Sequence, residues 1–161
     1  MIRVVVSCLA VITVAAACEN SVNPLIGFNG GGGAVTSAQA SGDWSLTLTK
    51  TTTLACSGGS LADGQVIALH LNVQTDGTVT AASSTWRNPS SGALLPVSGT
   101  VRLSDGVTDL ILSSGASSGM ELRGTIASTG NFTGTLTDPG AGLSPMFSTG
   151  GCEYNAPGSK A

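Results

Sequence analysis

The stretches MELRGTI (residues 120–126) and FTGTLT (residues 132–137) decide the fold class. In both, apolar residues or glycines alternate one by one with polar residues, and four of the six polar residues in the two stretches together are threonine. A period of two places the two sets on opposite faces of an extended chain, whereas a helix repeats every 3.6 residues. Each stretch therefore predicts an antiparallel β-strand with one face in a core and the other in solvent.

The same alternation recurs along the chain. It is clear at residues 44–49, 67–74 and 97–103, and weaker at 51–56, 78–85, 107–112 and 146–154. Asp-Gly pairs at 63–64, 76–77 and 105–106, and Asp-Pro-Gly at 138–140, are typical of tight turns between strands. This pattern predicts an all-β protein, an antiparallel up-and-down meander that closes into a small barrel of about eight strands, because closure removes exposed edges.

The composition excludes several functional classes. Only 9% of the 161 residues are charged, the net charge is −3, and there are six Lys and Arg residues. Typical domains carry roughly 25% charged residues. So few basic residues argue against a nucleic-acid partner. The small net charge argues against charge-driven disorder, and the 23 glycines argue against a helical bundle.

Three glycines, Gly99, Gly124 and Gly134, lie at apolar positions of the alternating pattern and precede threonine. Glycine at such positions permits the sharp coiling that small barrels need. The alternative is that a ligand approaches the backbone there, which glycine also permits.

The N-terminus has the organisation of an export signal. Arg3 precedes an apolar run that ends at Ala17 and is shorter than the about 20 residues that span a bilayer. Ala15-Ala16-Ala17-Cys18 resembles the lipobox of bacterial lipoproteins, although that family usually has Leu where this chain has Ala15. The resemblance implies that residues 1–17 are removed and that Cys18 is acylated. Simple secretion after Ala17 is the alternative.

An acylated Cys18 would make the membrane a partner through a lipid anchor. In some bacteria of that family, Asp after the cysteine retains the protein in the inner membrane. Glu19 therefore favours the outer membrane, on either its periplasmic or its surface side.

The composition divides the mature chain into three parts. Residues 18–41 contain a run of glycines at 30–33 and predict a flexible tether. Residues 42–155 are the predicted barrel domain, and residues 156–161 a C-terminal tail.

Four cysteines are present. Cys8 lies in the signal and Cys18 is the lipidation site, which leaves Cys56 and Cys152 as one pair in an exported domain. A disulfide between them is the expectation for that compartment. We expect no metal or other cofactor, because two distant cysteines and one histidine offer at most three ligands.

The residues available for catalysis are few. His70 is the only histidine, it lies on a polar strand face, and no G-x-S-x-G elbow accompanies it. Most aspartates fall in turns, which leaves Asp43, Asp109, Glu121 and Glu153 as candidate carboxylates. We expect a protein that is not an enzyme. A hydrolase would need His70 beside a carboxylate and a serine in a cleft.

The Trp86-Arg87-Asn88 segment is the candidate contact surface. An exposed tryptophan beside Arg and Asn could stack on a ligand or contact a partner. Ordinary loop packing of Trp86 is the alternative.

The chain resembles the small Gly- and Thr-rich lipoproteins of bacterial envelopes. Residues 15–18, the Gly-Thr repeats and Cys152-Glu153-Tyr154 carry this resemblance. Gly42-Asp43-Trp44 at the first strand is similar to the Gly-x-Trp of lipocalin- and avidin-type barrels. Those families line their ligand pockets with aromatic residues, whereas only 4% of this chain is aromatic.

The resemblances imply a non-catalytic, lipid-anchored envelope protein whose barrel binds a small apolar ligand or an envelope protein. The alternative is a structural or surface lipoprotein with a filled core and no ligand. An interior cavity open near Trp86 would distinguish the first from the second.

Overall fold

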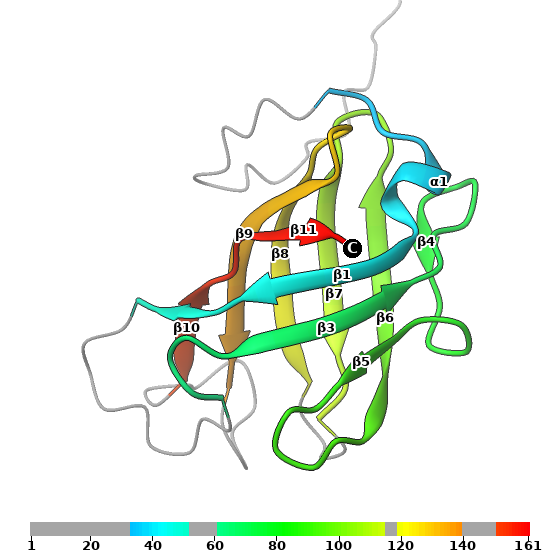
Figure 1. The fold of residues 1–161 in the computed structure, drawn as a ribbon. Helices are drawn as coiled ribbons and strands as arrows, with labels where there is room; N and C mark the ends of the chain where they lie inside the picture. The colour runs from blue at the N-terminus through cyan, green and yellow to red at the C-terminus, as the bar shows by residue number, and fades with distance from the viewer. Residues whose placement is uncertain (1–32, 52–60, 115–118, 140–150) are drawn as a thin grey trace, which may run out of the picture.

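The computed structural model describes residues 33–51, 61–114, 119–139 and 151–161 (Figure 1). It contains one short helix, α1 (Ser37–Ala40), and a single sheet. The strands are β1 (Gly42–Thr47), β2 (Thr49–Lys50), β3 (Val66–Leu71), β4 (Thr78–Val79), β5 (Thr85–Arg87), β6 (Leu94–Arg102), β7 (Val107–Leu112), β8 (Met120–Ile126), β9 (Asn131–Asp138), β10 (Cys152–Asn155) and β11 (Gly158–Lys160).

The sheet closes into an eight-stranded antiparallel barrel. From β5 to β9 each strand pairs with the next, β3 pairs with β1 and β5, and β11 closes the ring by pairing with both β9 and β1. The short strands β2, β4 and β10 lengthen the walls of the barrel without adding further members to the ring. The predicted fold class, an up-and-down meander closed into a barrel, is confirmed.

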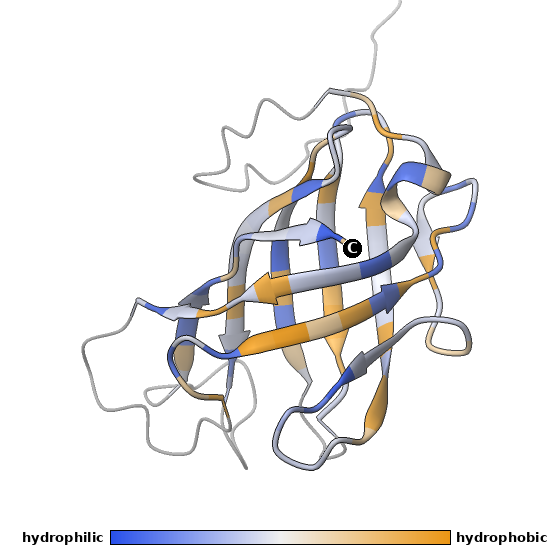
Figure 2. Cartoon of the chain, in the orientation of Figure 1, coloured by the Kyte–Doolittle hydropathy of each residue, from blue (hydrophilic) through white to orange (hydrophobic). Residues whose placement is uncertain are grey.

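The alternation in the sequence maps onto the two faces of the wall. In β8, Leu122 faces the interior opposite Leu110 and Leu136, while Arg123 faces out opposite Asp109. Figure 2 shows hydrophobic and hydrophilic bands alternating along the strands. The inward residues of β1 and of β3 to β10 form one core, which supplies most of the driving force for folding because its apolar surface leaves water.

Glycines let neighbouring strands coil closely. A Cβ atom added to Gly124 would clash with the carbonyl oxygen of Thr133 and would lie 2.6 Å from the ring of Phe132. Gly134, directly opposite Gly124 in the register, is crowded in the same way by the carbonyl oxygen of Arg123. The atoms that approach these glycines belong to the barrel itself, which supports the architectural interpretation of the Gly-Thr repeats.

The end of the predicted tether packs against the barrel. Thr36 and Gln39 form a reciprocal capping box around α1, and the buried Val35 donates its N–H to the carbonyl oxygen of Leu103 at 2.9 Å. The indole N–H of Trp44 donates to the carbonyl oxygen of Ala40 at 3.0 Å. The folded domain therefore begins at about residue 35 and not at the predicted residue 42, because buried contacts hold α1 over one end of the barrel.

The predicted C-terminal tail is also part of the barrel. Residues 158–160 form β11, and the N–H of Lys160 donates to the carbonyl oxygen of Gly130 at 2.8 Å. The structure corrects the boundary at residue 155: this segment joins the two edges that would otherwise be unpaired. Ala156 and Pro157 separate β10 from β11, and proline has no N–H to donate to a neighbouring strand. The sequence of this segment shows no regular alternation.

Other predictions concern residues outside the described parts. The signal at residues 1–17, Cys18, and the tether up to residue 32 lie there, and so does Cys56. Cys152 is buried in β10, and its disulfide with Cys56 stays a prediction. Among the described residues, no helix has the length and apolar character needed to cross a membrane.

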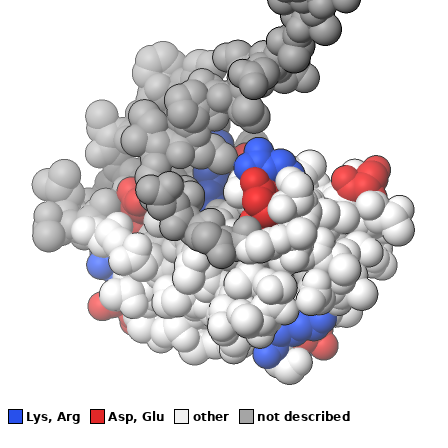
Figure 3. Space-filling view, turned by 90° about the horizontal axis from the view of Figure 1, so that it is seen from above, with Lys and Arg blue, Asp and Glu red and all other residues white. Residues whose placement is uncertain are grey.

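Charged side chains are sparse on the barrel surface. Figure 3 shows them as small separate groups on an otherwise uncharged face. Arg102 and Asp105 form one such group, and this contact holds the pKa of the Asp105 carboxyl below its usual range. Exposed pairs of this kind contribute little stability and create no extended field that would attract a charged partner.

Candidate functional site

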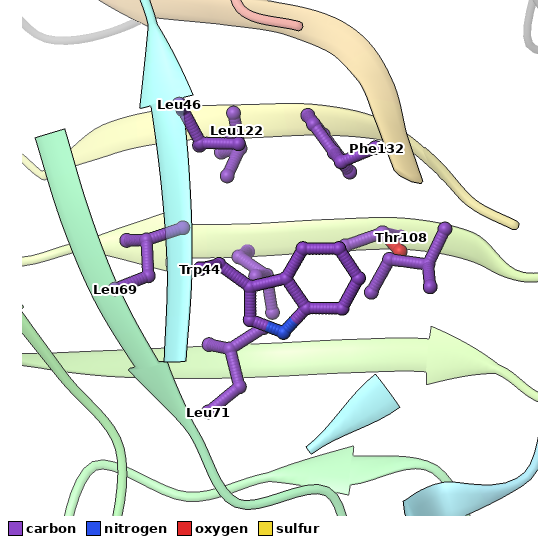
Figure 4. Close-up of a pocket in the computed structure, with 9 residues that line it drawn as sticks. Trp44, Leu46, Leu69, Leu71, Thr108, Leu122 and Phe132 are labelled. Atoms are coloured by element: carbon purple, nitrogen blue, oxygen red, sulfur yellow. The ribbon is translucent and has the colours of Figure 1, made fainter. Parts of the chain in front are cut away.

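Among the described residues, the barrel interior around Trp44 is closely packed. The cavity there measures about 10 Å³ and is lined by inward side chains that surround Trp44, among them Leu69, Leu122 and Phe132 (Figure 4). A single water molecule needs roughly this much space, and pockets for drug-sized ligands are about 300–1,000 Å³. The cavity is therefore too small to hold an apolar ligand.

Trp86 is buried in the core of the barrel. It lies in β5 between Leu69 and Leu95, it is 1% exposed, and its indole N–H donates to the carbonyl oxygen of Ser113 at 2.7 Å. The structure thus contradicts the prediction of an exposed contact residue. Thr85 and Arg87 point outward on either side, so the alternation Thr-Trp-Arg was the signal for an inward tryptophan.

Arg87 and Asn88 have different roles. The side-chain oxygen of Asn88 accepts the N–H groups of Ser90 and Ser91 at 2.9 and 3.3 Å, which shapes the turn between β5 and β6. Arg87 is exposed, and its guanidinium donates to the carbonyl oxygen of Gly92 at 3.0 Å. Of the predicted contact segment, Arg87 alone faces a surface hollow.

That hollow, which we name the outer groove, is the candidate functional site. It measures about 270 Å³ and lies on the outside of β1, β3 and β5. The outward side chains that line it and carry its chemistry are Asp43, Ser45, Ala68, His70, Thr85 and Arg87. Strand pairing brings them together from three separate parts of the sequence.

His70 is held by a carboxylate in this groove. Its Nδ1 lies 2.7 Å from Oδ1 of Asp43, the residue directly opposite it on β1. An ionised carboxylate can only accept a hydrogen bond, so Nδ1 carries the hydrogen and the unprotonated Nε2 of a neutral ring is an acceptor. Both side chains are well exposed, at 55% for His70 and 74% for Asp43.

The pair does not extend to a catalytic triad. Ser45 lies opposite Ala68, diagonally across from His70, and in the part of the chain that the structure describes no hydrogen bond joins Ser45 to His70. A serine nucleophile needs that bond, because the histidine must take its proton. The geometry therefore provides an oriented histidine without an activated serine.

The remaining candidate carboxylates have local partners or lie exposed. Arg123 pairs with Glu121 on its own strand and lies 3.6 Å from Asp109 on the next. Glu153 is exposed on β10. No group of three metal-binding side chains gathers among the described residues.

Comparison with known proteins finds no matching family model, no similar curated protein and no matching solved structure. The groove is therefore interpreted from the geometry of this chain alone.

Proposed function

We propose that this protein is a non-catalytic envelope lipoprotein, a barrel with a filled core that is carried on a lipid anchor at Cys18. The observation that carries the proposal is the interior cavity of about 10 Å³, which favours a structural or surface role over storage of an apolar ligand. Ala15-Ala16-Ala17-Cys18 supports export and anchoring, with the outer membrane favoured by Glu19.

On this proposal, contacts with envelope proteins are made by the outside of the wall. Large apolar side chains are exposed there at Val66, Leu94 and Ile111, on β3, β6 and β7. The lipid anchor supplies the affinity for the membrane, since more than one acyl chain holds a protein there stably. The barrel then needs no strong surface charge to stay in place.

Anchoring is tested by changing the acylated cysteine. The full chain is expressed in a bacterium that is fed radiolabelled palmitate. Wild type is expected to carry the label and to partition into detergent, and Cys18→Ser to lose both properties. Cys8→Ala, which changes a cysteine ten residues earlier in the signal, is the matched control and keeps the label. Unlabelled wild-type protein would overturn the proposal of a lipid anchor at Cys18.

The filled interior is tested by native mass spectrometry of the protein purified from its own envelope. The expected spectrum contains the acylated chain and no further small molecule. A co-purifying apolar compound, released on unfolding, would overturn the filled-core proposal and support the alternative that the barrel binds a ligand.

A hydrolase is the second candidate, and the contact between Asp43 and His70 is the observation that favours it. Hydrolysis of p-nitrophenyl acetate by wild type is compared with hydrolysis by His70→Gln. Equal rates would exclude His70 as a base. A loss of about 100-fold or more in His70→Gln, typical of a general base, would replace the non-catalytic proposal.

A further inference from the structure

The outer groove is hollow because of the order of side chains across the strands. Ala68 is paired with Ser45 on one side and Arg87 on the other, and Arg87 is paired with Leu94. The next row joins Asp43, His70 and Thr85 in the same way. Ala68 is thus a short side chain among longer ones, and its methyl group forms a floor between His70, Arg87 and Leu94.

Arg87 gives one side of the groove an anchor for an anion. One of its five N–H groups is used by the carbonyl oxygen of Gly92, which restrains the guanidinium near the turn. The remaining planar fork matches the two oxygens of a carboxylate.

In its neutral form, His70 gives the other side of the groove a hydrogen-bond acceptor. Asp43 orients the ring through Nδ1, so Nε2 is the ring nitrogen left for a ligand. Asp43 itself would repel an anion placed near it. The side of the groove formed by Asp43 and His70 therefore favours an uncharged hydrogen-bond donor of a ligand. The side formed by Arg87 favours an anionic group.

We propose that the outer groove binds a small hydroxylated carboxylate, such as a hydroxy acid or a sugar acid. The carboxylate contacts Arg87, a hydroxyl donates to Nε2 of His70, and the carbon chain lies on Ala68 and on the 60% exposed Leu94. The volume of about 270 Å³ suits a molecule below drug size. This binding site goes beyond the proposed envelope role and does not depend on the lipid anchor.

The experiment uses His70 as its own reporter, because it is the only histidine in the sequence. Lactate is titrated into the full chain while the imidazole resonances are followed by NMR, and propionate, which lacks the hydroxyl, is the matched probe. Lactate is expected to give a saturable shift and to bind about fivefold more tightly than propionate, the factor that one hydrogen bond of about 1 kcal/mol gives. Equal binding of the two would overturn the role of His70.

Two variants test the site itself. Arg87→Gln is expected to weaken the binding of lactate about tenfold or more, since a charge-assisted contact is lost. Arg102→Gln, which removes an arginine paired with Asp105 away from the groove, leaves binding unchanged. Ala68→Val keeps every charge but fills the floor of the groove, and it is expected to abolish the saturable shift. No saturable shift at about 100 mM lactate, or wild-type binding by Arg87→Gln or Ala68→Val, would overturn the proposal.

Discussion

Replacing Trp86 with alanine tests whether its side chain is buried in the barrel core as the structure indicates. A buried indole removes about 200 Å² from water, which at about 25 cal/mol per Å² is worth about 5 kcal/mol. The alanine methyl retains about 1 kcal/mol of this. The hydrogen bond to the carbonyl oxygen of Ser113 is lost as well, at about 1 kcal/mol.

We therefore expect Trp86→Ala to lower the free energy of unfolding by about 5 kcal/mol, at the upper end of the range of about 3–5 that such truncations cost. For a domain of this size that corresponds to a melting temperature lower by about 20 °C. Urea unfolding followed by circular dichroism measures the change.

Leu94→Ala is the control for this variant. It truncates a large apolar side chain on the outside of the wall, where it is 60% exposed, and is expected to change stability by less than about 0.5 kcal/mol. A loss below about 1 kcal/mol for Trp86→Ala would refute the interior placement. Iodide quenching of the fluorescence of the two tryptophans, Trp44 and Trp86, as strong as that of free indole would refute it too.

Three further predictions concern the backbone, the helix cap and a buried phenol. Gly124→Ala should lower the free energy of unfolding by about 1–3 kcal/mol, because its methyl group would meet the carbonyl oxygen of Thr133. Urea unfolding measures this loss, and it should show none for Gly33→Ala, which has open space around it. Thr36→Ala should remove the cap of α1 at a cost of about 1 kcal/mol and speed hydrogen exchange of the Ala40 amide, whereas Thr36→Ser, which keeps the hydroxyl, should not. Burial, followed by the charges of Asp138 and Asp63, raises the pKa of Tyr154 above its usual 10.0; absorbance at 295 nm, which reports the only tyrosine, should titrate at higher pH in the folded protein than in urea.

The Tyr154 prediction has a definite sign for stability. The folded state favours the neutral phenol, which donates to the carbonyl oxygen of Leu61 at 2.8 Å. Its contribution is complete below the unfolded pKa of about 10 and is lost as the pH rises through the raised folded pKa. Coincident titration curves for the folded and unfolded chains would contradict the burial of this hydroxyl.

The missed features of the fold had recognisable local signals in two cases. Thr36-Ser37-Ala38-Gln39 has the spacing of a capping box and could have predicted α1. The inward position of Trp86 follows from the polar residues on both sides of it. By contrast, residues 156–161 have no alternation, and their role in closing the barrel depends on the two strand edges between which they lie.

The outer groove could be predicted only in part. His70 and Asp43 were both identified as candidate residues, but they are 27 positions apart and their contact depends on the pairing of β1 with β3. Arg87 joins them because β5 pairs with β3, in a register that places it opposite Ala68. A shift of one residue would turn each of these side chains to the other face of the wall.

The sequence by itself determined the fold class, most of the strands and the face that most of their residues take, because alternation and tight turns act between near neighbours in the chain. Only the tertiary structure decided how the barrel closes, how closely its interior packs around Trp44, and which polar side chains share the outer groove. These properties depend on packing volume and on register between distant strands, and neither quantity is encoded in the spacing of residues along one strand.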